Sequence, residues 1–417
     1  MPGRTWIIAP DAESLRQRWQ ALIYAPENQK ESLFHPHLRK GKLGDKHSKK
    51  VVKKSLAGYP ARAKTIADER GSITEPTRYG FRFLDRQWII PDSRLINQPN
   101  PELWEMHSTQ QVYLTALEAH SPSSGPAVTF TGLIPDLHHY KGSFGGRAFP
   151  LWLDAQSRKP NVSENLTRYL SDRFEKVVNA DDVLAYIAAV ASQPAFTSRF
   201  KSDLVKPGLR IPFTSDEALF FEAVKVGHSV IWLQTFGERF ANNNQSRPGG
   251  PPRLTKDRPQ IPSNGAISTS PDEMPDEIEF DQGKRRLIIG SGYVENVTPE
   301  IWNYEVSGKN VLRQWFSYRK ANRERPIIGE RRQPSKLGDI QPDHWLAEYT
   351  TELINVLNVI GLLVELEPHQ ASLLERICSG PTISELELHS AGALAESKHQ
   401  TSNSKSTPAE QPSLLPQ

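Results

Sequence analysis

The chain has 417 residues, of which 37% are hydrophobic and 24% charged, so it holds enough apolar material for a folded core. The 51 basic and 48 acidic residues leave a net charge of only +3, and the overall charge therefore selects no class of partner. The single cysteine, Cys378, excludes an intramolecular disulfide and a cysteine-rich zinc site, which fits a cytoplasmic protein. No apolar run approaches the roughly 18 residues of a membrane span, so no membrane is expected.

The N-terminal half is predicted to combine strands and hairpins with helices. "RTWIIAP" is typical of a strand, and "DAESLRQRWQALI" predicts a helix that begins behind an Asp11 cap. A basic stretch follows, with eleven Lys or Arg and two acids between Lys30 and Lys64. Residues 78–96 predict a hairpin that turns near Leu84, and residues 127–153 predict short strands broken by glycines.

The middle and C-terminal parts are predicted to be mainly helical. Helices are expected over 163–176, over 181–192, from Pro194, over 216–240 and from about Lys309, followed by two helices separated by Pro368. The fold class is thus α+β. We divide the chain into a first part (1–240), a flexible Pro-, Gly- and Ser-rich insertion (241–282), a second part (283–390) and a disordered tail (391–417).

Linear signatures of catalysis are missing from the sequence. "LIIGSGYV" offers Gly290 and Gly292 after a strand, but Glu295 occupies the third glycine position of a dinucleotide-binding loop. "NPEL" at Asn100 lacks the second proline and the aromatic residue with which amino-group DNA methyltransferases hold the target amine. The histidine pairs 35/37 and 138/139 lack a further ligand at a familiar spacing. We therefore predict no catalytic, cofactor-binding or metal-binding residue.

Three stretches combine basic and aromatic residues, which is a pattern suited to nucleic acid. They are "RYGFRFLDRQWII" from Arg78, "HHYKGSFGGRAF" around Lys141, and the run from Lys309 to Lys336, which holds nine basic residues against two acids. Lys and Arg neutralise phosphates, and Arg also bonds to guanine edges. The alternative is that these charges are solvated or paired with local acids such as Asp85.

Five blocks in order resemble the C-terminal specificity part of type ISP restriction-modification enzymes. "FRFLDRQWII" is similar to the family's Tyr-Arg-Pro-Phe-Asp-Arg-Arg-Trp signature. The others are "GGRAFPLWL", "VLAYIAAVASQPAFTSRF", "LRIPF" and "VTPEIWNYEVSGKNVLRQWFSYRK". The resemblance covers roughly residues 1 to 380. Phe83, Gln87, Ser307 and Lys309 depart from the family pattern, so individual base contacts do not carry over.

The resemblance implies a part that reads double-stranded DNA for an adenine-specific methyltransferase. The methyltransferase, helicase and nuclease parts of the family are expected to lie outside this chain, and S-adenosylmethionine belongs to the missing catalytic half, so no cofactor is expected here. The residues predicted to face DNA are Arg82, Arg86, Lys141, Arg147, Lys309, Arg313, Arg319 and Lys320. The alternatives are a truncated or degenerate adenine-specific DNA methyltransferase and an assembly subunit of a defence complex that does not bind DNA.

Overall fold

A computed structural model of the chain describes residues 4–36, 38–39, 42–43, 47–117, 120–143, 145–206, 208–322 and 333–394. Its α-helices are α1 Ala12–Tyr24, α2 Glu27–Phe34, α3 Pro101–Glu105, α4 Glu164–Phe174, α5 Ala180–Ala191, α6 Pro194–Arg199, α7 Glu217–Gln234, α8 Pro299–Trp302, α9 Val311–Ser317, α10 Ala347–Ser379 and α11 Glu385–Ser390. Its strands are β1 Ile8–Ala9, β2 Leu38–Arg39, β3 Lys42–Leu43, β4 Thr77–Arg82, β5 Asp85–Ile89, β6 Tyr113–Ala116, β7 Thr129–Thr131, β8 Arg147–Pro150, β9 Ile278–Asp281, β10 Arg286–Ile289, β11 Gly292–Val294, β12 Glu305–Val306 and β13 Lys309–Asn310. This mixture confirms the α+β class.

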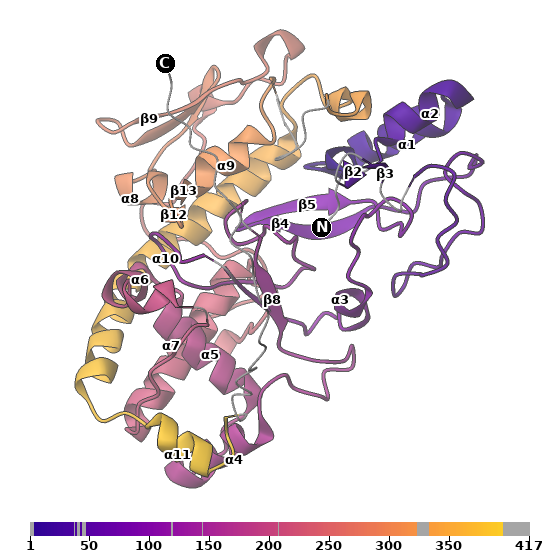
Figure 1. The fold of residues 1–417 in the computed structure, drawn as a ribbon. Helices are drawn as coiled ribbons and strands as arrows, with labels where there is room; N and C mark the ends of the chain where they lie inside the picture. Colours follow the sequence, from indigo (N-terminus) through magenta and orange to yellow (C-terminus); the bar gives the residue numbers. More distant parts are fainter. Residues whose placement is uncertain are drawn as a thin grey trace, which may run out of the picture.

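The strands form small antiparallel sheets rather than one large sheet. Among the described residues, three sheets have three strands each, in the orders β1-β5-β4, β7-β6-β8 and β11-β10-β9, and two hairpins pair β2 with β3 and β12 with β13. The predicted hairpin around Leu84 is confirmed, with Leu84 in the left-handed region at its turn. The β4–β5 hairpin lies near the middle of the molecule, between the indigo N-terminal helices and the helices α5 to α7 (Figure 1).

Local sequence signals place several helix ends where they were predicted. The carboxylate of Asp11 accepts a hydrogen bond from the Ser14 backbone N–H at 2.7 Å, which caps α1. Pro194 occupies the first turn of α6, where its missing N–H costs nothing. Both features are short-range, so the sequence alone predicts them.

Helices α5 and α7 pack closely at a glycine. A Cβ added at Gly227 of α7 would lie 1.6 Å from the backbone oxygen of Ala185 on α5. Only a residue without a side chain allows the two backbones to approach this far. The contact lies within the largest of the three apolar clusters, which α4 to α7 build together with β6 and β7.

The prediction of two helices separated by Pro368 is wrong, because α10 continues through that residue as one helix from Ala347 to Ser379. A proline inside a helix removes one backbone hydrogen bond and costs about 3 kcal/mol. The helix continues because its two ends are held by different cores: Leu353 and Val356 pack with the β9–β13 region, and Leu373 and Ile377 with the α4–α7 bundle. Burial on both sides offsets the lost bond.

Helix α10 is also long and apolar enough to cross a membrane, but 61% of its apolar stretch is buried inside the protein. It runs from the upper centre of Figure 1 along the left-hand side toward α11, in contact with both cores. We therefore assign it to the core.

The segment 241–282, whose predicted flexibility stays a prediction, contacts the core of the protein at Leu254. Leu254 is 4% exposed, and its N–H donates to the side-chain oxygen of Asn358 on α10 at 2.9 Å. The last residues of the segment form β9, which pairs with β10. The division of the chain at 240 and 282 stays a prediction, and residues 395–417 of the expected tail lie outside the described residues.

Candidate nucleic-acid interface

The arginines of the β4–β5 hairpin lie against carboxylates of other elements. Tyr79 and Phe81 are buried between them, at 5% and 8% exposure, so the hairpin is packed on both faces. This explains the alternation of aromatic and basic residues in "RYGFRFLDRQWII". Tyr79 and Phe81 fill the N-terminal core around α1 and β1, and Phe83 packs with the β9–β13 region, while the arginines connect the hairpin to neighbouring segments.

Arg82 forms a buried ion pair with Asp136, which follows β7. The guanidinium lies 2.8 Å from the Asp136 carboxylate, and Tyr79 donates its hydroxyl hydrogen to the other oxygen at 3.2 Å. Burial alone would raise the pKa of the Asp136 carboxyl. The Arg82 charge and a hydrogen bond from the His138 backbone outweigh this effect, so the pKa lies below its ordinary value. Asp136 is therefore ionised at neutral pH and fixes Arg82.

Arg86 and Arg78 connect the hairpin to helix α10. Arg86 lies 2.9 Å from Glu352 on α10 and 2.9 Å from Glu238, which follows α7. Arg78 lies 3.0 Å from Glu348, one turn before Glu352. The hairpin signature thus fixes α10 against the N-terminal core.

Arg319, which follows α9, takes Asp85 as its partner at 2.7 Å, and each side chain is 1% exposed. From the sequence, Asp85 was the alternative partner for the arginines of its own stretch. In the structure, Asp85 instead forms its ion pair with Arg319. Lys320 lies 3.0 Å from Asp276. Arg82, Arg86, Arg319 and Lys320 thus all lie in ion pairs with carboxylates, which leaves less of their charge for a ligand.

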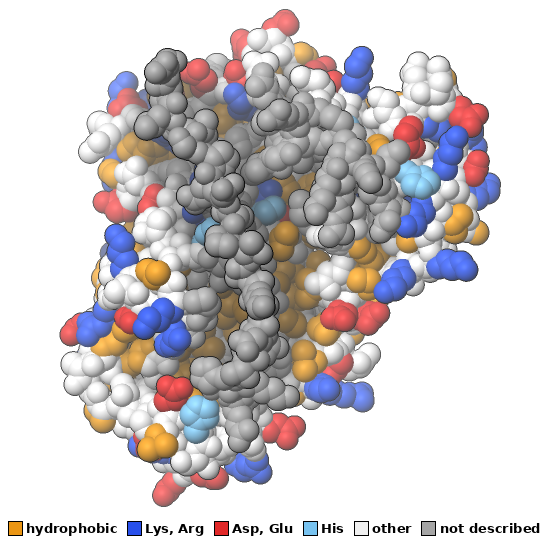
Figure 2. Space-filling model, viewed as in Figure 1, with side chains coloured by type: hydrophobic (Ala, Val, Ile, Leu, Met, Phe, Trp, Pro, Cys, Tyr) orange, Lys and Arg blue, Asp and Glu red, His pale blue; other side chains and the backbone are white. Residues whose placement is uncertain are grey.

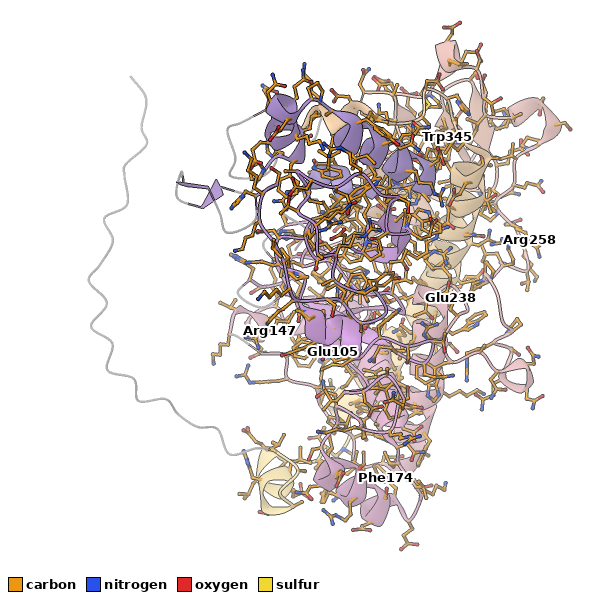
Figure 3. All side chains as sticks on the ribbon, turned by 90° about the vertical axis from the view of Figure 1, so that its right-hand side faces the viewer. Glu105, Arg147, Phe174, Glu238, Arg258 and Trp345 are labelled. Atoms are coloured by element: carbon orange, nitrogen blue, oxygen red, sulfur yellow. The ribbon has the colours of Figure 1, made fainter. Side chains whose placement is uncertain are left out.

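Arg147 is exposed at the start of β8, which is an edge strand of its sheet. Phe149, two residues along the same face of the strand, is 43% exposed. A cavity of about 360 Å³ lies beside them, between the β4–β5 hairpin, α3 and β8. Figure 3 shows Arg147 and Arg258 at opposite edges of the molecule. An exposed arginine beside an exposed aromatic ring is suited to nucleic acid.

Lys141 contacts the β12–β13 hairpin, which also carries Lys309, and Arg313 lies on the helix α9 that follows. The Lys141 ammonium lies 3.3 Å from the Ser307 hydroxyl, and Ser307 precedes Lys309 by two residues. Arg313 is exposed on α9 and stacks on Trp302, with 4.9 Å from its guanidinium carbon to the ring centre. Residues 323–332 of the basic run lie outside the described residues. Whether any of the eight predicted residues contacts DNA stays a prediction.

A further group of exposed lysines was not assigned a role from the sequence. It lies in the segment after α2, held to the core by the buried residues Leu56 and Ile66. Figure 2 shows Lys and Arg side chains along the right-hand side of the molecule over this region. The exposed members are Lys49, Lys53, Lys54 and Lys64. The excess of eleven basic residues over two acids between 30 and 64 was the signal that could have found them.

His138 and His139, one of the two histidine pairs in the sequence, form hydrogen bonds with neighbouring protein groups. His139 is 2% exposed, its Nδ1 lies 3.0 Å from the Thr115 hydroxyl, and burial lowers its pKa to about 3. The Nδ1 of His138 accepts the Gly145 N–H at 3.0 Å. Within the described residues, no group of three or more His, Cys, Asp or Glu side chains is placed to hold a metal. Gly290 lies in the turn of the β10–β11 hairpin, so "LIIGSGYV" is not followed by a helix as a dinucleotide loop would be.

Comparison with solved structures relates the fold to proteins whose structures were solved with DNA. The cryo-EM structure of a DrdV–DNA complex superposes with a TM-score of 0.52 and 14% identity over 89% of this chain and 34% of that chain. The ATP-dependent Type ISP restriction-modification enzyme LlaBIII bound to DNA gives a TM-score of 0.52 and 12% identity over 89% of this chain and 22% of that one. At these identities the likeness concerns the fold alone, and the chain spans about a third or less of those proteins. A search of curated proteins found no match.

The family assignment comes from the sequence itself. Residues 1–356 match the family described as the Type ISP C-terminal specificity domain. The match includes the β4–β5 hairpin, strand β8 and the β12–β13 hairpin, which belong to three of the five blocks that resemble the family. This chain therefore belongs to the Type ISP C-terminal specificity domain family.

Proposed function

We propose that this chain is the DNA target-recognition part of a type ISP-like restriction-modification system. Its membership of the specificity-domain family over residues 1–356 is the observation that carries the proposal. The exposed cations Arg147, Lys309 and Arg313 and the half-buried Lys141 supply charge for a phosphate backbone. Two of the similar structures, a DrdV–DNA complex and the restriction-modification enzyme LlaBIII bound to DNA, contain DNA, which agrees with this role.

The proposed partner is an adenine-specific methyltransferase acting on the same duplex. To reach the amino group of an adenine, such an enzyme turns the base out of the helix. The present chain holds and reads the surrounding duplex, while S-adenosylmethionine binds to the methyltransferase. Phosphate contacts fix the register, and contacts to base edges select the sequence. We place this activity in the cytoplasm, which the single cysteine of the chain fits.

A salt titration of duplex binding tests the proposal. The affinity of the full chain for a fluorescent duplex is measured by anisotropy, alone and with the methyltransferase, between roughly 50 and 200 mM KCl. We expect affinity to fall steeply with salt, because each neutralised phosphate contributes a slope of about −0.9 in log K against log salt. An absence of duplex binding at low salt in both preparations contradicts the proposal and favours an assembly subunit that does not touch DNA.

A further inference from the structure

The segment 48–67, which we call the lysine arm, folds back on itself between β3 and β4. Its two ends meet where the Ala67 N–H donates to the Ser48 oxygen at 3.0 Å. At its tip, Leu56 and Tyr59 exchange backbone hydrogen bonds of 2.8 and 3.2 Å. Gly58, in the left-handed region with a φ of 79°, completes the turn between them. The arm lies on the right-hand side of Figure 1, between the N-terminal helices and α3.

The backbone of the lysine arm is held against the protein at several points. Leu56 and Ile66 are buried, at 2% and 1% exposure. The ring of Tyr59 meets that of Trp104 on α3 edge-on, with 5.6 Å between the ring centres. The buried Arg94 donates to the Lys64 backbone oxygen at 2.7 Å. The core therefore fixes where the outward side chains of the arm leave the surface.

The charge of the lysine arm has one sign. The arm contains six basic residues and no acidic residue. One of the six, Arg62, lies 3.4 Å from Glu69 just outside the arm. Four others are exposed and form no ion pair with a carboxylate among the described residues: Lys49, Lys53, Lys54 and Lys64. In the longer stretch 30–64, eleven basic residues stand against two acids, so local acids cannot neutralise this surface.

The chemistry of the lysine arm suits phosphates better than base edges or a membrane. Lysine is a flexible point charge, whereas the planar fork of arginine is the group that reads guanine. The aromatic ring of the arm, Tyr59, already packs on Trp104. Within this segment, all of which the structure describes, Val51 is the one large hydrophobic side chain that is strongly exposed, at 49%. A membrane-binding surface would present more apolar area beside its lysines.

The lysine arm is linked through α3 to the exposed edge of β8. Trp104, which contacts Tyr59 of the arm, also lines the cavity of about 360 Å³ beside Arg147 and Phe149. In Figure 1 the arm, α3 and β8 follow one another from the right-hand side toward the middle of the molecule. A duplex held at β8 and continuing past α3 therefore meets the lysines of the arm.

We propose that the lysine arm binds backbone phosphates of the duplex beside the sequence that is read. This inference rests on the proposed function and deepens it by naming a second surface, which holds DNA without reading it. A phosphate carries no base identity, so the arm contributes affinity equally for every duplex sequence. Its contribution falls with salt, because each phosphate contact releases counterions.

Matched quadruple variants test the lysine arm in the full chain. The arm variant carries glutamine at the four exposed lysines of the arm. The control variant removes the same amount of charge from exposed lysines elsewhere, by Lys201→Gln, Lys206→Gln, Lys225→Gln and Lys256→Gln. Anisotropy of one fluorescent duplex is measured across a KCl series. We expect the slope of log K against log salt to be smaller in the arm variant than in the control by about 1.8 or more, which corresponds to at least two phosphates.

Two further measurements separate phosphate binding from other roles of the arm. A second duplex of unrelated sequence should lose affinity by the same factor, and arginine at the four positions should retain the slope. A slope difference below about 1.8 between arm and control variants overturns the inference, as does a loss confined to one duplex sequence. An arm variant that keeps its slope but no longer binds the methyltransferase would identify a protein-binding surface instead.

The folding of the variants is checked by their melting temperatures. The four side chains are exposed, so the arm variant should melt as the wild type does. If it melts lower, Lys53→Gln with Lys54→Gln is compared with Lys225→Gln and Lys256→Gln, and an unchanged slope there overturns the inference. A wild type that binds no duplex removes the proposed function itself, whereas a wild type that binds while arm and control variants agree removes the lysine arm alone.

Discussion

Arg319 and Asp85 are 234 positions apart in the sequence and lie 2.7 Å apart in the structure, each with 1% of its side chain exposed. The Arg319 guanidinium also lies 3.8 Å from the centre of the Trp315 ring and donates to the Trp315 backbone oxygen at 2.8 Å. The pair joins the turn of the β4–β5 hairpin to the end of α9. It shows that a basic and aromatic sequence motif can serve the interior of a protein.

Removing one member of this pair should destabilise the protein strongly. Arg319→Met or Asp85→Asn leaves a buried group without its charged partner, which costs about 3–5 kcal/mol in the free energy of unfolding. Urea unfolding followed by tryptophan fluorescence measures the change. The double variant should lose less than the sum of the singles, because neither charge is then left uncompensated. Single losses below about 1 kcal/mol are incompatible with the pairing.

A methyl group at Gly227 should disturb the packing of α5 on α7. Gly227→Ala places a Cβ 1.6 Å from the Ala185 backbone oxygen, and backbone cannot move aside as a flexible side chain does. We expect a loss of about 2 kcal/mol or more in the free energy of unfolding. Gly249→Ala is the matched control, since a Cβ there meets nothing within 4 Å among the described residues. Equal stabilities of the two variants would show that the helices are not so close.

Glu367 should make stability depend on pH. Burial raises the pKa of this carboxyl from 4.5 to about 7, and its Oε1 has no hydrogen-bond partner among the described residues. The folded state therefore favours the protonated form, and the associated stability is present below pH 4.5 and lost as the pH rises through 7. Glu367→Gln should raise the melting temperature at pH 8 and change it little at pH 4.5. A shift of equal size at both pH values contradicts this assignment.

Arg147→Ala tests the outward face of β8 and rests on the proposed function. If Arg147 contacts a phosphate, its removal weakens all duplexes alike and reduces the salt slope by about 0.9. If Arg147 contacts a base edge, the loss in binding free energy is about 1–3 kcal/mol for one duplex sequence and smaller for others. Anisotropy titrations with two duplex sequences separate these cases. Unchanged affinity for both duplexes would place Arg147 outside the interface.

Short-range features of the fold could be predicted from the sequence. The Asp11 cap, the proline at the start of α6 and the hairpin around Leu84 depend on residues within a few positions of each other. Strand β6 was not predicted, because all four of its residues are buried and it shows no alternation. The continuous α10 was not predicted either, since only packing at both of its ends explains why Pro368 does not stop it.

Prediction of the candidate site was limited in the same way, because the partners of its arginines are distant in the sequence. An arginine beside an aromatic residue looks alike in the sequence whether it faces a phosphate or a buried carboxylate. Asp136, the ion-pair partner of Arg82, lies 54 positions away from it in the chain. Glu352, the partner of Arg86, lies 266 positions away. The position of Ser307 under Lys141 likewise depends on a contact between segments 166 residues apart. The family resemblance pointed to the role of the chain, and the structure shows that Arg82, Arg86 and Arg319 form ion pairs with carboxylates.

Selection from a library of random duplexes tests target recognition most directly. The full chain, with the proposed partner methyltransferase, is incubated with the library at physiological salt, and the bound duplexes are sequenced. We predict enrichment of one short sequence motif, bound more tightly than a scrambled duplex by a factor of roughly 10³ or more. Binding that enriches no sequence, or no binding at all, would contradict the assignment of this chain as a DNA target-recognition part.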